Sequence, residues 1–191
     1  MSNIFQVALG LMRQQLKDTE HVRMNPIVMN SDMSTNVIPN FIKVGTDLRT
    51  KTVDYMKIVA DRIDKAAKGS AICLDGEVES ETQMGYLPFV QDRYIGQFVV
   101  EAFDEQSEIK TLWNNKFISA AGDIGDLSYI MPCIQIGYSG FAGTIHGDDF
   151  KDEDPEMIYE IFPKFVAKSL EYMSGKIDKS KLYKKSFKEY E

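Results

Sequence analysis

The sequence predicts a mixed α/β (α+β) chain with two differently built parts. In the first part, two segments carry apolar residues at three- and four-residue spacing, which is typical of amphipathic helices. The segments around them are shorter and either alternate or are continuously apolar, which favours β-strands. In the second part helical stripes dominate and two short strand candidates occur, so we expect little sheet there.

Five elements are predicted in the first 85 residues. Apolar periodicity predicts helices over residues 3–18 and 53–67, and Gly69 or Gly76 is expected to end the second helix. Strands are expected at residues 23–29, 37–49 and 77–83. The resulting order, α-β-β-α-β, is a ferredoxin-like β-α-β-β-α-β order without its first strand.

The second part begins after the connector GYLPFVQD. Residues 95–103 form a helical stripe, and residues 116–121 and 133–138 are short buried strand candidates. Asp154 is expected to cap a further helix, because proline follows it at the first helical position. Pro163 lies inside that helical stripe and must kink or divide it. Several of these helices have wide apolar faces, so most of the sheet that they would cover is expected to lie outside this chain.

Composition restricts the partners and the compartment. The net charge of −7 argues against nucleic acid, which requires a basic surface. No segment approaches the roughly 18 apolar residues of a membrane helix, and the first residues do not resemble a signal peptide. Cys73 and Cys133 lie in apolar sequence and are expected to be buried, reduced thiols. These features favour a cytoplasmic protein with neither nucleic acid nor membrane as partner.

Three residues in the stretch GDIGDLSYIMPCIQIGYSGFAGTIHGDDF could carry chemistry. Asp123 and Asp126 could bind a cation or orient a histidine, or could belong to an ordinary loop and helix start. His146 lies in a polar, glycine-framed loop, which suits a metal ligand or a proton shuttle. One histidine does not make a zinc site, which needs at least three protein ligands. The other histidine, His21, lies among charged residues and is expected to be exposed.

Two further residues could bind an acidic substrate. Asn36 lies in a predicted turn, and Arg49 ends a predicted strand on its polar side. A guanidinium binds a carboxylate through two parallel hydrogen bonds, although a surface salt bridge is the better explanation of Arg49. The acidic run at residues 148–156 lacks the spacing of a calcium loop and is expected to be a solvated face and a helix start.

Four segments together resemble a known enzyme family. They are MRQQLKDTEHVRMNPIVMNSDMSTNVIPNFIKVGTDLRT, GYLPFVQD, GDIGDLSYIMP and IHGDDFKDEDPEMIYEIFPKFVAKSL. In order, they resemble the metal-dependent amidohydrolases that include aminoacylases, glutamate carboxypeptidases and aminobenzoyl-glutamate hydrolases, the last branch most closely. The resemblance implies a two-metal α/β hydrolase domain interrupted by a ferredoxin-like lid domain that dimerises.

The resemblance divides the chain into three regions. Residues 1–86 resemble an incomplete lid or dimerisation domain, residues 87–173 the C-terminal segment of the catalytic domain, and residues 174–191 form a lysine-rich tail. An H-x-D motif, a bridging aspartate and a Glu-Glu pair would carry the other ligands and the general base, and this sequence contains none of them at the matching places. His146 falls on the last metal-binding histidine of the family. Asp123 and Asp126 fall on a wall of its site. Three residues fall on lid positions that contact substrate: Asn25, Asn36 and Arg49. Asn25 stands where the family usually has histidine.

The resemblance implies hydrolysis of N-acyl amino acids or aminobenzoyl-glutamate-like amides, with zinc or manganese as the cofactor of the full-length family. Because one ligand of several is present, we expect this chain to be inactive alone and to bind no metal tightly. A homodimer through the lid is expected. Two alternatives stay open: a non-catalytic dimerisation or binding module derived from the lid, and one half of a split enzyme that a separate N-terminal chain completes.

Overall fold

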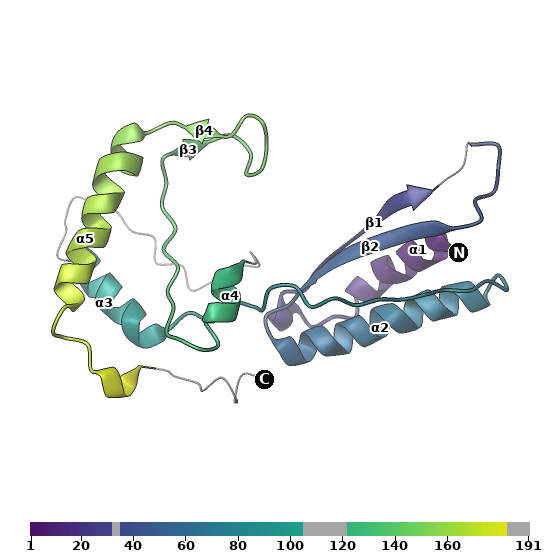
Figure 1. Cartoon of the computed structure of the whole chain (residues 1–191), viewed down its shortest axis with the longest axis horizontal. Coiled ribbons are helices and arrows are strands. Elements are labelled where there is room, and N and C mark those ends of the chain that lie inside the picture. Colours follow the sequence, from purple (N-terminus) through teal and green to yellow (C-terminus); the bar gives the residue numbers. More distant parts are fainter. Residues whose placement is uncertain (32–34, 105–121, 183–191) are drawn as a thin grey trace. The chain divides into compact units, whose positions relative to one another are not determined.

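The computed structural model describes residues 1–31, 35–104 and 122–182 (Figure 1). Within these ranges the protein is mixed α+β, with five α-helices and two small two-stranded antiparallel sheets. The described residues fall into two compact units, residues 1–89 with 122–126 and residues 90–104 with 127–182. No helix in the described ranges has the length and apolar character needed to cross a membrane.

The first unit is built on one antiparallel hairpin. Strands β1 (Arg23–Ser31) and β2 (Ile42–Arg49) pair in register from Arg23 opposite Arg49 to Ser31 opposite Ile42. A bulge at Met29 interrupts the ladder, and Pro26 stands opposite Thr46. The predicted strands 23–29 and 37–49 are thus confirmed, although the second begins at residue 42.

Helices α1 (Ser2–Arg13) and α2 (Val53–Ile72) contribute the rest of this unit's core. The buried centre consists of Leu9, Met12 and Met24. Five partly buried side chains from both helices, the segment after α1 and β2 surround it: Phe5, Leu16, Leu48, Ile63 and Ala66. Alternation along the strands explains the arrangement, because successive strand residues face opposite sides. Met24 and Leu48 therefore reach the helices, while Asn25 and Asp47 lie on the exposed side.

Both ends of α2 follow from local sequence. The hydroxyl of Thr52 accepts a hydrogen bond from the backbone N–H of Tyr55, which caps the first turn. The helix runs through Gly69 and ends at Ile72. Asp75 then adopts a left-handed conformation with φ of 48°, and the N–H of Gly76 returns to the carbonyl of Ala71 at 3.0 Å. Gly69 does not stop the helix, and the left-handed conformation beyond its end belongs to Asp75, one residue before Gly76.

The predicted strand over residues 77–83 is wrong. This segment forms no helix or strand, and no strand among the described residues pairs with it. Its sequence, EVESETQ, alternates but offers one apolar side chain, so it has no hydrophobic face to bury. Ser80 of this segment instead contacts Asp64 on α2, where a hydrogen bond from Lys68 and a second one from Ser80 lower the pKa of the carboxyl. The observed order of this unit is therefore α-β-β-α, and no specific fold is identified from it.

The second unit is held together by two helices. α3 (Arg93–Asp104) begins where the Asp92 carboxylate accepts the N–H of Ile95 at 2.8 Å, and it packs on α5 (Phe162–Met173). The core centres on Phe165, Val99 and Met173. The predicted helical stripe at residues 95–103 is confirmed.

The sheet of the second unit is smaller than predicted and lies elsewhere. Residues 133–138 are not a strand, although Ile134 and Ile136 pack on the core and the carbonyl of Cys133 accepts the N–H of Asp92 at 2.8 Å. No neighbouring strand completes a ladder there within the described residues. The sheet consists of β3 (Phe141–Ala142) and β4 (Lys151–Asp152). The candidate strand at residues 116–121 lies outside the described residues.

The last long helix divides as its proline requires. Asp154 caps the start by accepting the N–H of Met157 at 3.0 Å, as predicted. A π-helical turn, η2 (Met157–Ile161), follows, and the N–H of Phe162 reaches back five residues to the carbonyl of Met157. Pro163 lies in the first turn of α5, where its missing N–H is tolerated. The π turn thus provides the division that Pro163 predicts.

Two short 3-10 turns complete the described elements. The first, η1 (Asp18–Glu20), follows α1, and the second, η3 (Lys179–Lys181), lies in the lysine-rich tail. A short helix, α4 (Asp123–Leu127), carries the GDIGD sequence.

The prediction of two buried thiols is wrong for Cys73, which is exposed just past the end of α2, whereas Cys133 is partly buried.

Candidate functional site

The hairpin brings two of the predicted substrate-binding residues together. Asn25 stands opposite Asp47, and Arg49 lies two residues further along β2, so all three side chains share the exposed side of the hairpin. Directly opposed residues on antiparallel strands have Cβ atoms about 4.5–5.5 Å apart. Asn25 and Arg49 are therefore diagonal neighbours.

An ion pair orients the guanidinium on this side of the hairpin. The Nε of Arg49 donates to the Asp47 carboxylate at 2.6 Å. Arg23 lies opposite Arg49 on the neighbouring strand, so Asp47 also offsets the repulsion between two cations. The salt bridge that the sequence left as an alternative for Arg49 is present.

Asn36 lies apart from these residues. It belongs to the turn between the strands, at the end of the hairpin opposite to Asn25. The six residue-to-residue steps from Asn25 to Ser31 span about 20 Å at about 3.3 Å each. Within one copy of the chain, Asn36 therefore does not join Asn25 and Arg49 in a single site.

The GDIGD sequence holds a neighbouring segment of backbone in place. The carboxylate of Asp126 accepts the N–H of Leu87 at 2.9 Å, and buried Gly125 lies so close to the Leu87 carbonyl that a Cβ would collide with it. Asp123 is the first residue of α4 and is exposed. Asp126 thus has a structural partner, while the structure does not restrict Asp123 in this way.

His146 is displayed on a tightly organised loop between β3 and β4. Its backbone is left-handed, with φ of 66°, and its side chain is exposed. The Asp149 carboxylate accepts the N–H of Thr144 at 3.1 Å and its hydroxyl at 3.4 Å, and the N–H of Gly147 donates to the Thr144 carbonyl at 2.7 Å. These bonds fix the loop on both sides of His146, so the exposed imidazole is carried by an ordered backbone.

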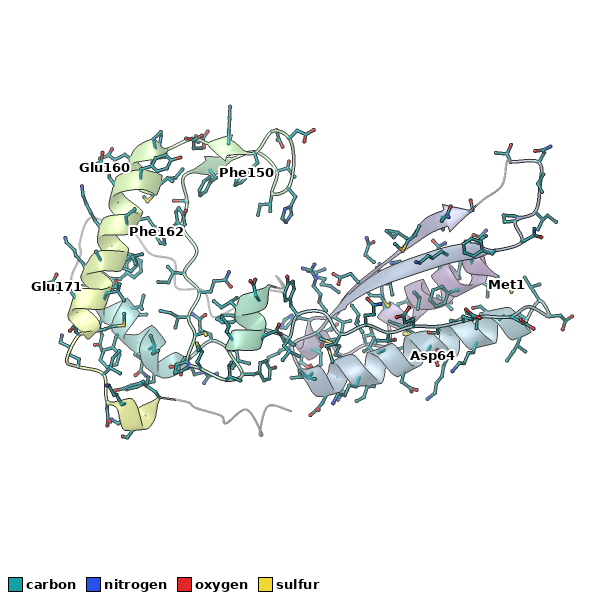
Figure 2. The ribbon with its side chains drawn as sticks, viewed as in Figure 1. Met1, Asp64, Phe150, Glu160, Phe162 and Glu171 are labelled. Atoms are coloured by element: carbon teal, nitrogen blue, oxygen red, sulfur yellow. The ribbon has the colours of Figure 1, made fainter. Side chains whose placement is uncertain are left out.

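A row of aromatic rings supports the base of this loop. Phe150 stacks on Phe141 at 5.3 Å between centroids, and Tyr138 packs on Phe141 at 5.5 Å and on Phe162 at 3.8 Å. Figure 2 labels Phe150 beside the small sheet and Phe162 on the helix. Three of these rings remain more than a third exposed: Tyr138, Phe141 and Phe150. An aromatic surface therefore lies beside the loop that carries His146.

The candidate residues do not form a complete metal centre within either unit. His146 belongs to the second unit, and the other candidates belong to the first: Asn25, Asn36, Arg49, Asp123 and Asp126. Over the residues that the structure describes, no group of three histidine, cysteine, aspartate or glutamate side chains could hold a metal ion. Zinc in a catalytic site takes three protein ligands, so the described residues do not fit a metal by themselves. No step of a metal-dependent reaction can be derived from them.

A basic depression in the first unit was not expected from the sequence. It has a volume of about 450 Å³ and lies between the end of α1 and the start of β1. Its lining includes four residues that can carry positive charge: Arg13, Lys17, His21 and Arg23. The four-residue spacing of Arg13 and Lys17 is visible in the sequence, but the turn that brings Arg23 beside them is not. His21 is exposed, as predicted.

Comparisons of the sequence with protein-family models and with curated proteins found no match. What the candidate residues can do therefore has to follow from their own chemistry and surroundings.

Proposed function

We propose that this chain contributes a lid and one wall of the catalytic centre to a metal-dependent amidohydrolase. The reaction is hydrolysis of amide bonds in N-acyl amino acids or aminobenzoyl-glutamate-like compounds, and the metal is zinc or manganese. The observation that carries the proposal is the exposed His146, held in a left-handed conformation by a loop that Thr144 and Asp149 pin from both sides. The resemblance of the surrounding sequence to that family gives this histidine its role.

The chemistry of His146 supports one ligand of a shared site. A neutral imidazole is the commonest protein ligand of metals such as zinc. Because a catalytic zinc needs three protein ligands, the remaining donors must come from outside the described part of this chain. A separate N-terminal chain that carries them is one source. We therefore expect the chain alone to bind metal weakly and to hydrolyse nothing.

The exposed side of the hairpin supports binding of an acidic substrate. Arginine recognises carboxylates through its planar, forked donors, and Asp47 holds the Arg49 guanidinium in one orientation. The side-chain amide of Asn25 lies next to it and can donate or accept. Substrates that end in a glutamate or another amino acid would present the carboxylate that this pair suits.

A second candidate function is a dimerisation or binding module without catalysis. β1 and β2 form a sheet of two strands, which leaves each strand with one edge that no other described strand covers. Three consecutive apolar residues of β1 are about half exposed: Ile27, Val28 and Met29. Val7 and Leu11 on α1 are exposed as well. Open edges and apolar surface favour association with a second copy.

Metal titration tests the first proposal. We expect zinc or manganese to bind weakly at one site of the purified chain, and His146→Ala to abolish that binding. His21→Ala is a matched control, because His21 is also exposed and also left-handed, with φ of 47°. Hydrolysis of N-acyl amino acids or aminobenzoyl-glutamate by the chain alone, lost on addition of a chelator, would show that the site is complete without other donors. Binding that persists in His146→Ala would remove His146 from the site.

Light scattering at increasing protein concentration tests the second candidate. We expect a dimer, and Ile27→Lys on the exposed side of β1 should weaken it because the charge would be buried on association. Lys57→Gln on an exposed turn of α2 serves as the control. A monomer at all concentrations would exclude dimerisation by this chain alone.

A further inference from the structure

We propose that the basic depression of the first unit binds a small anion with two negative charges, such as a phosphate ester or a dicarboxylate. The site is defined by Arg13, Lys17 and Arg23, with His21 at its edge. It does not depend on amide hydrolysis, because none of these four residues belongs to the groups that the amidohydrolase proposal uses. Asn25 alone is common to both, since it lies at the rim of the depression.

The depression is positively charged, although the chain as a whole is negatively charged. The whole protein has a net charge of −7, yet three permanent cations and the single carboxylate of Asp18 leave this lining with a net charge of +2. Elsewhere lysines lie one helical turn from an acid, as Lys65 does from Asp61 at 2.6 Å. By contrast, neither Arg13 nor Arg23 forms an ion pair with any residue that the structure describes.

Electrostatics of the helix end explains part of this cluster but not all of it. Arg13 lies in the last turn of α1, where a cation interacts favourably with the terminal carbonyls. Lys17 lies beyond the helix, and its ammonium group lies 5.6 Å from the ring centre of Tyr55. Arg23 lies on β1 and has no helix end to neutralise. Cations that line one depression repel one another where their charges lie within the screening distance of about 8–10 Å, and a bound dianion would relieve that repulsion.

The shape of the depression suits a small organic anion. Its volume of about 450 Å³ falls within the usual range for small-molecule sites. Three apolar side chains line the depression together with the charged ones, and Met24 among them is buried: Leu16, Val22 and Met24. Two arginines can each bind a carboxylate or phosphate through paired hydrogen bonds. The rim thus provides the charge, and the apolar lining provides contact for a carbon skeleton.

Calorimetric titration of the full chain with inorganic phosphate and, separately, with succinate tests the proposal at matched ionic strength. We expect saturable binding of at least one of them, and the stronger of the two identifies the anion class. Arg23→Gln should weaken binding by roughly tenfold, because it removes a charge-assisted pair of hydrogen bonds. Lys57→Gln on α2 removes the same charge away from the depression and should change nothing.

A variant that is expected to bind the anion more tightly distinguishes a loss of binding contacts from a loss of folded protein. Asp18→Asn removes the carboxylate of the lining, so we expect tighter binding of the same anion by a factor of about three to ten. The thermal midpoint should rise with phosphate or succinate in the wild type and more strongly in Asp18→Asn. Absence of saturable binding by both anions would overturn the proposal. Binding that is unchanged in both Arg13→Gln and Arg23→Gln would overturn it equally.

Discussion

The carboxylate of Asp126 accepts a hydrogen bond from the backbone N–H of Leu87 at 2.9 Å. The same Leu87 turns its carbonyl toward Gly125, where a side chain would not fit. Two residues of GDIGD therefore lie against one backbone position: Asp126 accepts its N–H, and Gly125 leaves room for its carbonyl. This sequence has a structural role whether or not it also forms a wall of a catalytic site.

Replacement of Asp126 by alanine should destabilise the protein by about 1–3 kcal/mol, because the partly buried N–H of Leu87 would lose its acceptor. Asp126→Asn keeps an acceptor oxygen and should cost less. Urea unfolding followed by circular dichroism measures both changes. Equal stability of Asp126→Ala and the wild type would mean that the hydrogen bond contributes nothing.

Replacement of Gly125 by alanine should also destabilise the protein, by about 1–3 kcal/mol, because the new methyl group must displace the Leu87 backbone. Gly69 offers the matched control, since its surroundings on α2 are open. Gly69→Ala should stabilise the protein by about 1 kcal/mol through its higher helix propensity. The thermal midpoint should therefore fall in Gly125→Ala and rise in Gly69→Ala.

Phe165 is the best-buried large side chain of the second unit, with 1% of its surface exposed, and its ring stacks on Phe103 at 3.7 Å. Phe165→Ala should cost about 3–5 kcal/mol. Leu170→Ala on the same helix, at a residue that is 61% exposed, should cost less than about 0.5 kcal/mol. Hydrogen exchange of α3 and α5 amides would detect the difference, and similar exchange in both variants would contradict this core.

The two cysteines should differ in reactivity. Burial raises the pKa of the Cys133 thiol, and the negative charge of Asp92 raises it further, so less reactive thiolate is present at neutral pH. Cys73 is exposed. Iodoacetamide at pH 7.5 should modify Cys73 several times faster, as mass spectrometry of digested protein can show. Raising the pH should increase the rate at Cys133, and equal rates at both cysteines in the neutral range would contradict the prediction.

Elements that depend on local chemistry could be predicted from the sequence. The cap at Asp154 and the division at Pro163 follow from capping and backbone restrictions that act over a few residues. The period of the apolar residues likewise gave the two helices of the first unit and α3.

The wrong predictions of secondary structure concern strands, because a strand exists only where a partner pairs with it. Residues 77–83 and 133–138 have extended patterns, but among the described residues neither finds a partner strand. The pairing of Phe141 with Asp152 depends instead on the conformation of the loop between them, including Gly143 with φ of 88°. Alternation along one segment does not contain that information.

The candidate site was predicted in part for the same reason. The sequence indicated His146 and its exposed loop, and it placed Arg49 on the polar side of its strand. It did not reveal that Asp47 would pair with Arg49 or that Arg23 would complete a basic depression. Which residues face Arg49 across the hairpin depends on the strand register, and side-chain patterning leaves that register open by steps of two residues. The depression depends on the turn between α1 and β1, which brings Arg23 beside Arg13 and Lys17.

Pro26 in β1 makes the outer edge of β2, and not that of β1, the better place for another strand to pair. Proline has no N–H to donate, so it fits a strand where its nitrogen faces away from the paired strand. The outer edge of β1 therefore lacks a hydrogen-bond donor at Pro26. The outer edge of β2 contains no proline. A second copy that adds along β2 would leave two proline-bearing strands outermost, and each would discourage a third copy from joining. Assembly through this sheet would then close at a pair instead of extending into a fibre.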